Sequence, residues 1–126
     1  MHPKNSWQNL IDNIDEVRLI LSTLSNAKRL RILYTLLNQE MSAGALAIAT
    51  RLTHSAISQH LGVLVNRGIV SRQQQAKHII YQVASPSIEL MLTALSNMYM
   101  GENDESRNAE TPVQTSFATS NSRSVS

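Results

Sequence analysis

The sequence contains no cysteine. This absence excludes a disulfide scaffold, a thiolate zinc site, a cysteine nucleophile and thiol-based redox sensing. Aromatic residues make up only 4% of the chain, so the core must be built mainly from aliphatic side chains. Charged residues are also scarce, at 16%, against roughly 25% in an average soluble domain.

Long apolar runs are missing as well. No stretch approaches the roughly 20 apolar residues that a membrane span needs. Met1–Trp7 is polar and lacks the apolar run of a secretory signal, so a soluble cytoplasmic protein is expected. With 126 residues and 42% hydrophobic residues, the chain is predicted to form one folded domain over 7–101. Residues 102–126 are rich in Ser, Thr, Asn and Glu, which predicts a disordered polar tail.

The positive charge of the chain is concentrated in its middle. The formal net charge is only +2, but residues 25–83 contain seven Lys and Arg residues and one acidic residue, Glu40. Both flanks, 1–24 and 102–126, carry more acidic than basic residues. A basic block of this kind suits a polyanion such as nucleic acid. On charge alone, a solvated basic face is an equally good interpretation.

Hydrophobic periodicity predicts a series of helices. Apolar residues recur at steps of three and four from Leu10 to Leu24, which is the pattern of one amphipathic helix over 7–24. Ser, Thr and Asn stand where N-caps are needed before the next three helices. These are predicted over 27–38 after Asn26, over 43–50 after Ser42, and over 54–67 after Thr53.

After residue 68 the hydrophobic pattern is no longer that of a helix. The β-branched runs 69–73 and 78–83 flank the polar segment 74–77, which predicts a β-hairpin with a polar tip. Ser85-Pro86 opens a last helix that ends at Gly101. The order is helix, helix, short helix, helix, hairpin, helix. The predicted fold class is therefore mainly α with a small β-hairpin, a winged helix-turn-helix.

This order predicts DNA binding, because a major groove admits one α-helix whose polar side chains meet the base edges. The helix over 54–67 is the expected recognition helix, and Gln suits bidentate contact with adenine. The predicted base-reading residues are His54, Ser55, Ser58 and Gln59. The predicted contacts to the DNA backbone, from the helices and the wing, are Lys28, Arg29, Arg67, Arg72, Lys77 and His78. His60 lies toward the inner side and is expected to pack or to orient a neighbour.

Several motifs resemble those of one known family. They are Ser25–Leu33, Ser55–Leu64 and the wing segments Gly68–Arg72 and His78–Tyr81. On these motifs, residues 19–100 resemble the bacterial ArsR-type winged-helix repressors. The segments Met41–Ala47 and Leu95–Tyr99 are most similar to a rhizobial branch of that family.

The resemblance implies a homodimer that binds a partly symmetric double-stranded DNA operator and represses transcription. It also implies that the first and last helices form the dimer interface, through Leu10, Ile14, Val17, Leu21, Met91, Leu92, Leu95 and Met98. Many members sense metals through cysteines or through His and carboxylate ligands on the last helix. Here that helix offers only Glu89, so no metal site, thiol switch or cofactor is expected, and any small-molecule effector stays unidentified.

Two other classes of function compete with this one. An enzyme is disfavoured, because the sequence has no Gly-rich phosphate loop, no cysteine nucleophile and no paired carboxylates in a structured region, so no catalytic residue is predicted. A protein-interaction module with a winged-helix fold and incidental DNA binding is the alternative. The outward face of the helix over 54–67 favours DNA, because it is polar and has no acidic residue, whereas a protein-docking face is richer in aromatic residues.

Overall fold

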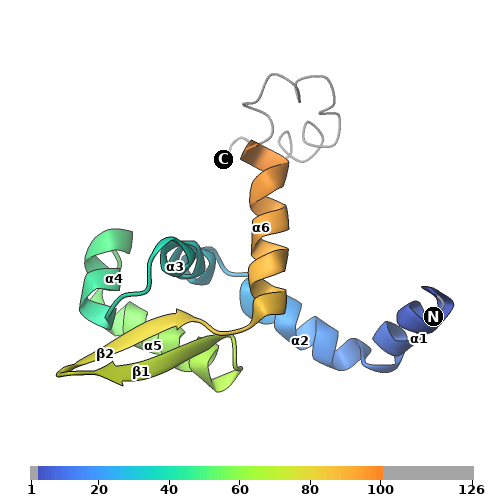
Figure 1. Ribbon diagram of the computed structural model, residues 1–126, viewed down its shortest axis with the longest axis horizontal. Coiled ribbons are helices and arrows are strands. Elements are labelled where there is room, and N and C mark those ends of the chain that lie inside the picture. Colours follow the sequence, from blue (N-terminus) through green and yellow to red (C-terminus); the bar gives the residue numbers. More distant parts are fainter. Residues whose placement is uncertain (1–2, 101–126) are drawn as a thin grey trace. The chain divides into compact units, whose positions relative to one another are not determined.

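The computed structural model describes residues 3–100, so the expected tail over 102–126 and the helix end at Gly101 lie outside the described residues. The chain divides into two units, the first ending at Pro86 and the second beginning at Ser87. The first unit places five helices before a two-stranded antiparallel sheet (Figure 1). In chain order they are α1 (Pro3–Asp12), α2 (Ile14–Leu24), α3 (Ala27–Asn38), α4 (Ala43–Thr50), α5 (His54–Asn66), β1 (Val70–Gln75) and β2 (His78–Val83).

The predicted single helix over 7–24 is two helices, α1 and α2. The backbone leaves the helical conformation at Asn13, with φ −115° and ψ 30°. The Asn13 side-chain amide donates to the carbonyl of Asn9 at 2.9 Å. Asparagine favours such local bonds to the backbone, and they compete with the regular helical ladder. The amphipathic period continues across the break, which is why periodicity alone does not reveal it.

The other helix starts of the first unit agree with the predictions. The Asn26 side chain accepts the N–H of Arg29 at 3.0 Å, and the Ser42 hydroxyl accepts that of Ala45 at 3.1 Å. Each side chain satisfies an N–H that the first turn of a helix would leave without a partner. At the end of α5, Gly68 has φ +74°, a conformation that glycine adopts without the cost of a Cβ.

The core of the first unit is aliphatic, as the composition predicts. The buried apolar residues come from the end of α2, from α3, α4 and α5, and from the start of the hairpin: Leu24, Ile32, Leu33, Leu36, Leu46, Ile57, Leu61, Leu64, Ile69 and Val70. On α5 the buried residues are Ile57, Leu61 and Leu64, and Val65 is half-buried. The core therefore holds α5 by one side and leaves its polar side exposed.

The hairpin is longer than predicted. Gln74 and Gln75 belong to β1 instead of the tip, and Ala76–Lys77 form a two-residue turn. Ala76 has φ +58°, and its carbonyl accepts the side-chain amide of Gln74 at 3.0 Å. Met41 pairs with Tyr81 through two backbone hydrogen bonds of 3.2 and 2.9 Å. This short bridge fixes the hairpin to the chain that leads into α4.

The second unit contains one described helix, α6 (Pro86–Met100), which starts at the predicted proline. Ile88 and Leu92 are buried, whereas Leu95, Met98 and Tyr99 are exposed. No helix within residues 3–100 is both long and apolar enough to cross a bilayer.

Candidate nucleic-acid interface

The turn between α4 and α5 is tight and is stabilised by several hydrogen bonds. Arg51 takes the left-handed conformation, with φ +63°, and Thr53 caps α5 by accepting the N–H of Ala56 at 3.0 Å. The buried Thr50 hydroxyl donates to the carbonyl of Leu46 at 2.6 Å. Arg31 donates from α3 to the Thr50 carbonyl at 3.0 Å. The angle between the two helices of the helix-turn-helix is therefore set by hydrogen bonds at its corner.

The four predicted base-reading side chains are all exposed on the first two turns of α5. They are His54, Ser55, Ser58 and Gln59. His54 also lies close to α4, since its Nε2 is 3.8 Å from the position a Cβ would take on Gly44. The helix carries no acidic residue. Its outward face therefore offers hydrogen-bonding groups without repelling a polyanion.

A groove of about 410 Å³ runs between α5 and the hairpin. Its lining residues are Ala43, Ser58, Leu61, Gly62, Val65, Asn66, Arg72 and Tyr81. The groove thus brings together Ser58 from the predicted reading face and Arg72 from the predicted wing contacts. Arg72 and Tyr81 are direct cross-strand partners, so their side chains share one face of the hairpin. The sequence prediction missed Asn66 and Tyr81. The register of the two strands would have indicated Tyr81, which pairs with Arg72.

The wing presents its polar residues at and near the turn. Lys77 and His78 are exposed at the tip. Arg72, Gln73 and Gln74 line a second hollow of about 260 Å³ together with Ile79. The predicted wing residues therefore cluster, with Arg72 contributing to both hollows.

The remaining basic residues are more dispersed. Lys28 is exposed at the start of α3. Arg67 lies at the C-terminal end of α5, about 20 Å along the helix axis from His54. There it lines a pocket of about 210 Å³ with Glu16, Leu19, Ile20 and Thr23 of α2. The structure therefore does not bring Arg67 together with the wing residues.

Arg29 differs from the expectation of a backbone contact, because its guanidinium is turned toward the protein. Its Nε donates to Nδ1 of His60 at 3.3 Å, and its Nη1 donates to the carbonyl of Thr23 at 3.1 Å. His60 is expected to pack or to orient a neighbour, and it accepts this bond from Arg29. Burial, followed by the positive charges of Arg29 and Lys28, lowers the pKa of His60 below its usual value of 6.5. The imidazole is therefore neutral near pH 7, with Nδ1 as the acceptor.

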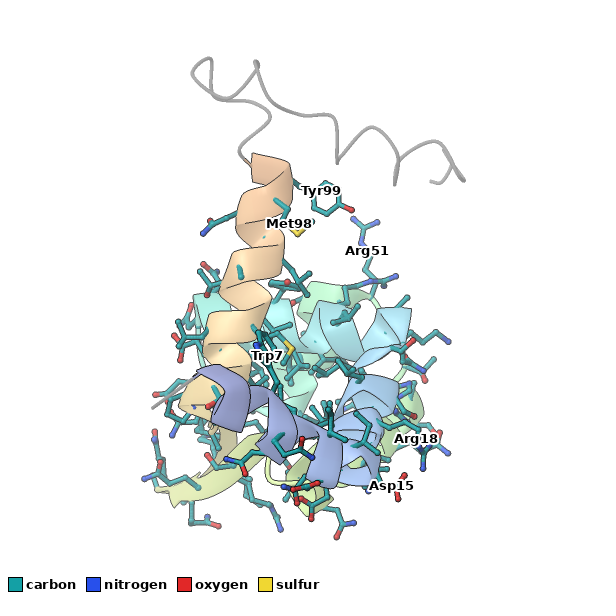
Figure 2. All side chains as sticks on the ribbon, turned by 90° about the vertical axis from the view of Figure 1, so that its right-hand side faces the viewer. Trp7, Asp15, Arg18, Arg51, Met98 and Tyr99 are labelled. Atoms are coloured by element: carbon teal, nitrogen blue, oxygen red, sulfur yellow. The ribbon has the colours of Figure 1, made fainter. Side chains whose placement is uncertain are left out.

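The predicted dimer residues fall into two groups, one in each unit. On α1 and α2, Leu10, Ile14 and Leu21 are exposed and Val17 is half-buried, and Trp7 extends from α1 (Figure 2). On α6, Leu95 and Met98 are 42% and 41% exposed, and Met91 is half-buried. Leu92, the remaining predicted residue of α6, is fully buried within the chain.

No group of three His, Cys, Asp or Glu side chains within residues 3–100 could hold a metal ion. Glu89 stands in the first turn of α6, in the second unit, whereas His54, His60 and His78 belong to the first. The described part of the chain therefore offers no ligand set for a transition metal, which needs three or four donors.

Comparison with known proteins agrees with this geometry. A family model described as bacterial regulatory protein, arsR family, matches residues 18–72. Nodulation protein NolR of Rhizobium meliloti is 42% identical over 84 residues, which is 67% of this chain and 69% of that protein. Transcriptional activator HlyU of Vibrio cholerae is 32% identical over 96 residues, or 76% of this chain and 89% of that protein.

A solved structure extends the likeness to three dimensions. The crystal structure of the transcriptional repressor BigR from Xylella fastidiosa superposes with a TM-score of 0.66 at 29% identity. The match covers 75% of this chain and 94% of that one. The winged helix-turn-helix predicted from the sequence, and the resemblance carried by its motifs, are confirmed.

Proposed function

The chain belongs to the ArsR family of DNA-binding transcriptional regulators, and we propose that it binds a partly symmetric operator as a homodimer and represses transcription. Family membership makes it a regulator and not an enzyme. Among its relatives, HlyU is named an activator and BigR a repressor. Repression is the simpler outcome for a small dimer, because bound protein blocks the promoter.

One observation carries the proposal. The exposed, acid-free face of α5 shares a groove with Arg72 of the wing, which supports a proposed base-reading group, Ser58, beside a proposed phosphate contact. In this proposal Ser58, Gln59, His54 and Ser55 enter the major groove. Lys28, Arg67, Arg72, Lys77 and His78 approach phosphates, which position a protein on DNA without reading its sequence.

A second copy of the chain is the proposed partner of the exposed apolar side chains. Leucine, isoleucine and tryptophan side chains on α1 and α2 and the exposed residues of α6 would be costly in water. A two-fold dimer presents two recognition helices about one DNA turn, roughly 34 Å, apart, which explains the expected symmetry of the operator. We place the protein at the nucleoid of the bacterial cytoplasm, where operator DNA is found.

Control by the amount of protein, or by a ligand other than a metal or an oxidant, fits the composition best. The chain has no cysteine, and the described residues have no metal-ligand cluster. Autoregulation is the simplest arrangement of this kind, because the protein then limits its own synthesis.

Titration of the purified protein against DNA from its own promoter tests the proposal. A scrambled duplex of the same composition is the control, and both are measured at two salt concentrations. We expect tight binding of one dimer per promoter site, well above the scrambled duplex. Equal and strongly salt-dependent binding to both duplexes would favour the interaction module, for which DNA is incidental.

A further inference from the structure

Arg29 connects three helices of the first unit. Its backbone N–H donates to the cap residue Asn26, its Nη1 to the carbonyl of Thr23 in the last turn of α2, and its Nε to His60 on α5. The residue is half-buried. A single side chain therefore links the end of α2 and the start of α3 to the middle of the recognition helix.

The α2 end of this link is a stable place for a cation. Carbonyls in the last turn of a helix lack partners within it, and the helix dipole is negative there. The N–H of Ser25 serves the carbonyls of Leu21 and Ser22, and that of Asn26 serves Leu24. The carbonyl of Thr23 receives Arg29. The guanidinium therefore has two hydrogen-bond partners inside the protein, Thr23 and His60.

On α5 the link ends beside the residues that are proposed to contact the DNA bases. His60 directly follows Gln59 and lies two residues after Ser58. Consecutive side chains on a helix project about 100° apart, so the direction of one determines that of its neighbours. A rotation of α5 about its own axis would swing Ser58 and Gln59 away from their positions and would also pull His60 from Arg29.

We propose that Arg29 and His60 form a positioning pair that sets the rotation of the recognition helix, and that the operator is bound with full affinity only while their hydrogen bond is made. The inference rests on the proposed function of operator binding. It assigns Arg29 to positioning and leaves the phosphate contact at the start of α3 to the exposed Lys28.

The pair is sensitive to acid. Nδ1 of His60 accepts the Arg29 bond only when it carries no proton. The charged groups that act on His60 are Arg29 and Lys28, both cations on α3, and from α2 the pair meets only the uncharged carbonyl of Thr23. A second proton on the imidazole would point an N–H at the guanidinium N–H. Acidification therefore breaks the link.

The experiment compares matched variants in binding to operator and scrambled DNA. Arg29→Ala and Lys28→Ala each remove one positive charge from adjacent positions. We expect Arg29→Ala to weaken operator binding about tenfold, as expected for losing one hydrogen bond from a charged group, with an unchanged salt slope. Lys28→Ala is expected to weaken both duplexes alike and to lower the slope by about one. A slope lowered by about one in Arg29→Ala would make Arg29 a phosphate contact and overturn the proposal.

The second arm follows operator affinity from pH 8 to pH 5.5. His60→Asn keeps an acceptor near the position of Nδ1 and cannot titrate in this range, whereas His60→Leu keeps a similar volume without an acceptor. We expect wild-type affinity to fall as the pH falls through the lowered pKa of His60. We expect His60→Asn to lack this fall and His60→Leu to be weak throughout. Circular dichroism at each pH checks that the variants are folded.

The outcomes separate the two proposals. Wild-type protein without preference for the operator at any pH would refute the proposed function. Wild-type protein that prefers the operator, together with a His60→Leu variant of equal affinity or a His60→Asn variant with the wild-type pH profile, would overturn only the positioning pair.

Discussion

Arginine residues with the same guanidinium have different roles because their partners differ. Arg29 and Arg31 each donate to the carbonyl of a helix end, whereas Arg72 is exposed in the groove beside Ser58. We expect Arg72→Ala to weaken binding to every DNA sequence and to lower the salt slope by about one, because one phosphate contact is lost. Arg18→Ala is the matched control: it removes an exposed arginine from α2 (Figure 2), and no residue of α2 lines the groove. Equal slopes for the two variants would exclude Arg72 from phosphate binding.

Base reading is a separate property of single residues. Gln59→Ala is expected to reduce the preference for operator over scrambled DNA by about 1–3 kcal/mol, the size of a good bidentate contact. Competition titrations with the two duplexes measure it directly. Gln73→Ala, which removes an exposed glutamine from the wing, is the control and should leave the preference unchanged. If Gln59→Ala weakens both duplexes by the same factor, Gln59 does not read bases.

His60 also predicts how stability changes with pH. Its pKa in the folded protein lies below the usual 6.5, mainly because of burial and then because of Arg29 and Lys28. At pH values between the pKa of folded His60 and that of unfolded His60, the unfolded chain binds more protons than the folded protein. The free energy of unfolding therefore rises with pH in this range. The contribution is complete above about pH 6.5 and is lost as the pH falls through the folded pKa. Urea titrations at several pH values should show a shallower acid dependence for His60→Asn. An unchanged dependence would mean that other groups cause it.

At the scale of one element, the start of the recognition helix depends on a single cap. Thr53 accepts the N–H of Ala56 at 3.0 Å, and Thr53→Ala would leave that donor without its partner. We expect a loss of about 1 kcal/mol in the free energy of unfolding, measured by urea titration. Thr53→Ser keeps the hydroxyl and should retain most of the stability. Equal losses in both variants would mean that the Thr53 methyl group, and not the cap, stabilises the helix.

At the scale of the whole molecule, the exposed residues of α6 are expected to contact a second copy. Met98 and Tyr99 project from its last turns (Figure 2). We expect the double variant Leu95→Asp, Met98→Asp to be monomeric in light scattering, because a dimer would have to bury two carboxylates from each copy. Operator affinity should fall with it, since one recognition helix then binds alone. Thr93→Asp places one carboxylate on another exposed side of α6 and should leave the dimer intact. A double variant that stays dimeric would remove this face from the interface.

Much of the fold follows from the sequence, because it is encoded by interactions between near neighbours. Asn26, Ser42 and Thr53 begin their helices by bonds that span three residues, and the aliphatic period places Ile57, Leu61 and Leu64 inside. The break at Asn13 is the exception, because it leaves the hydrophobic period intact. The same period predicts the proposed reading face of α5, because that face lies opposite the buried side of the helix.

Tertiary structure decided the features that depend on distant partners. Arg29 and His60 are 31 residues apart, so no local pattern shows that the guanidinium turns inward. Nor could periodicity distinguish Leu92, which is buried, from the exposed Leu95 on the same helix. The groove joining Ser58 to Arg72 and Tyr81 exists only once strand register and helix packing are set. The sequence determined which residue types are available and which helices and strands they form. Only packing decided whether a charged or apolar side chain contacts a partner within the chain or is exposed to another molecule. The reason is that packing brings together groups that are far apart in the sequence.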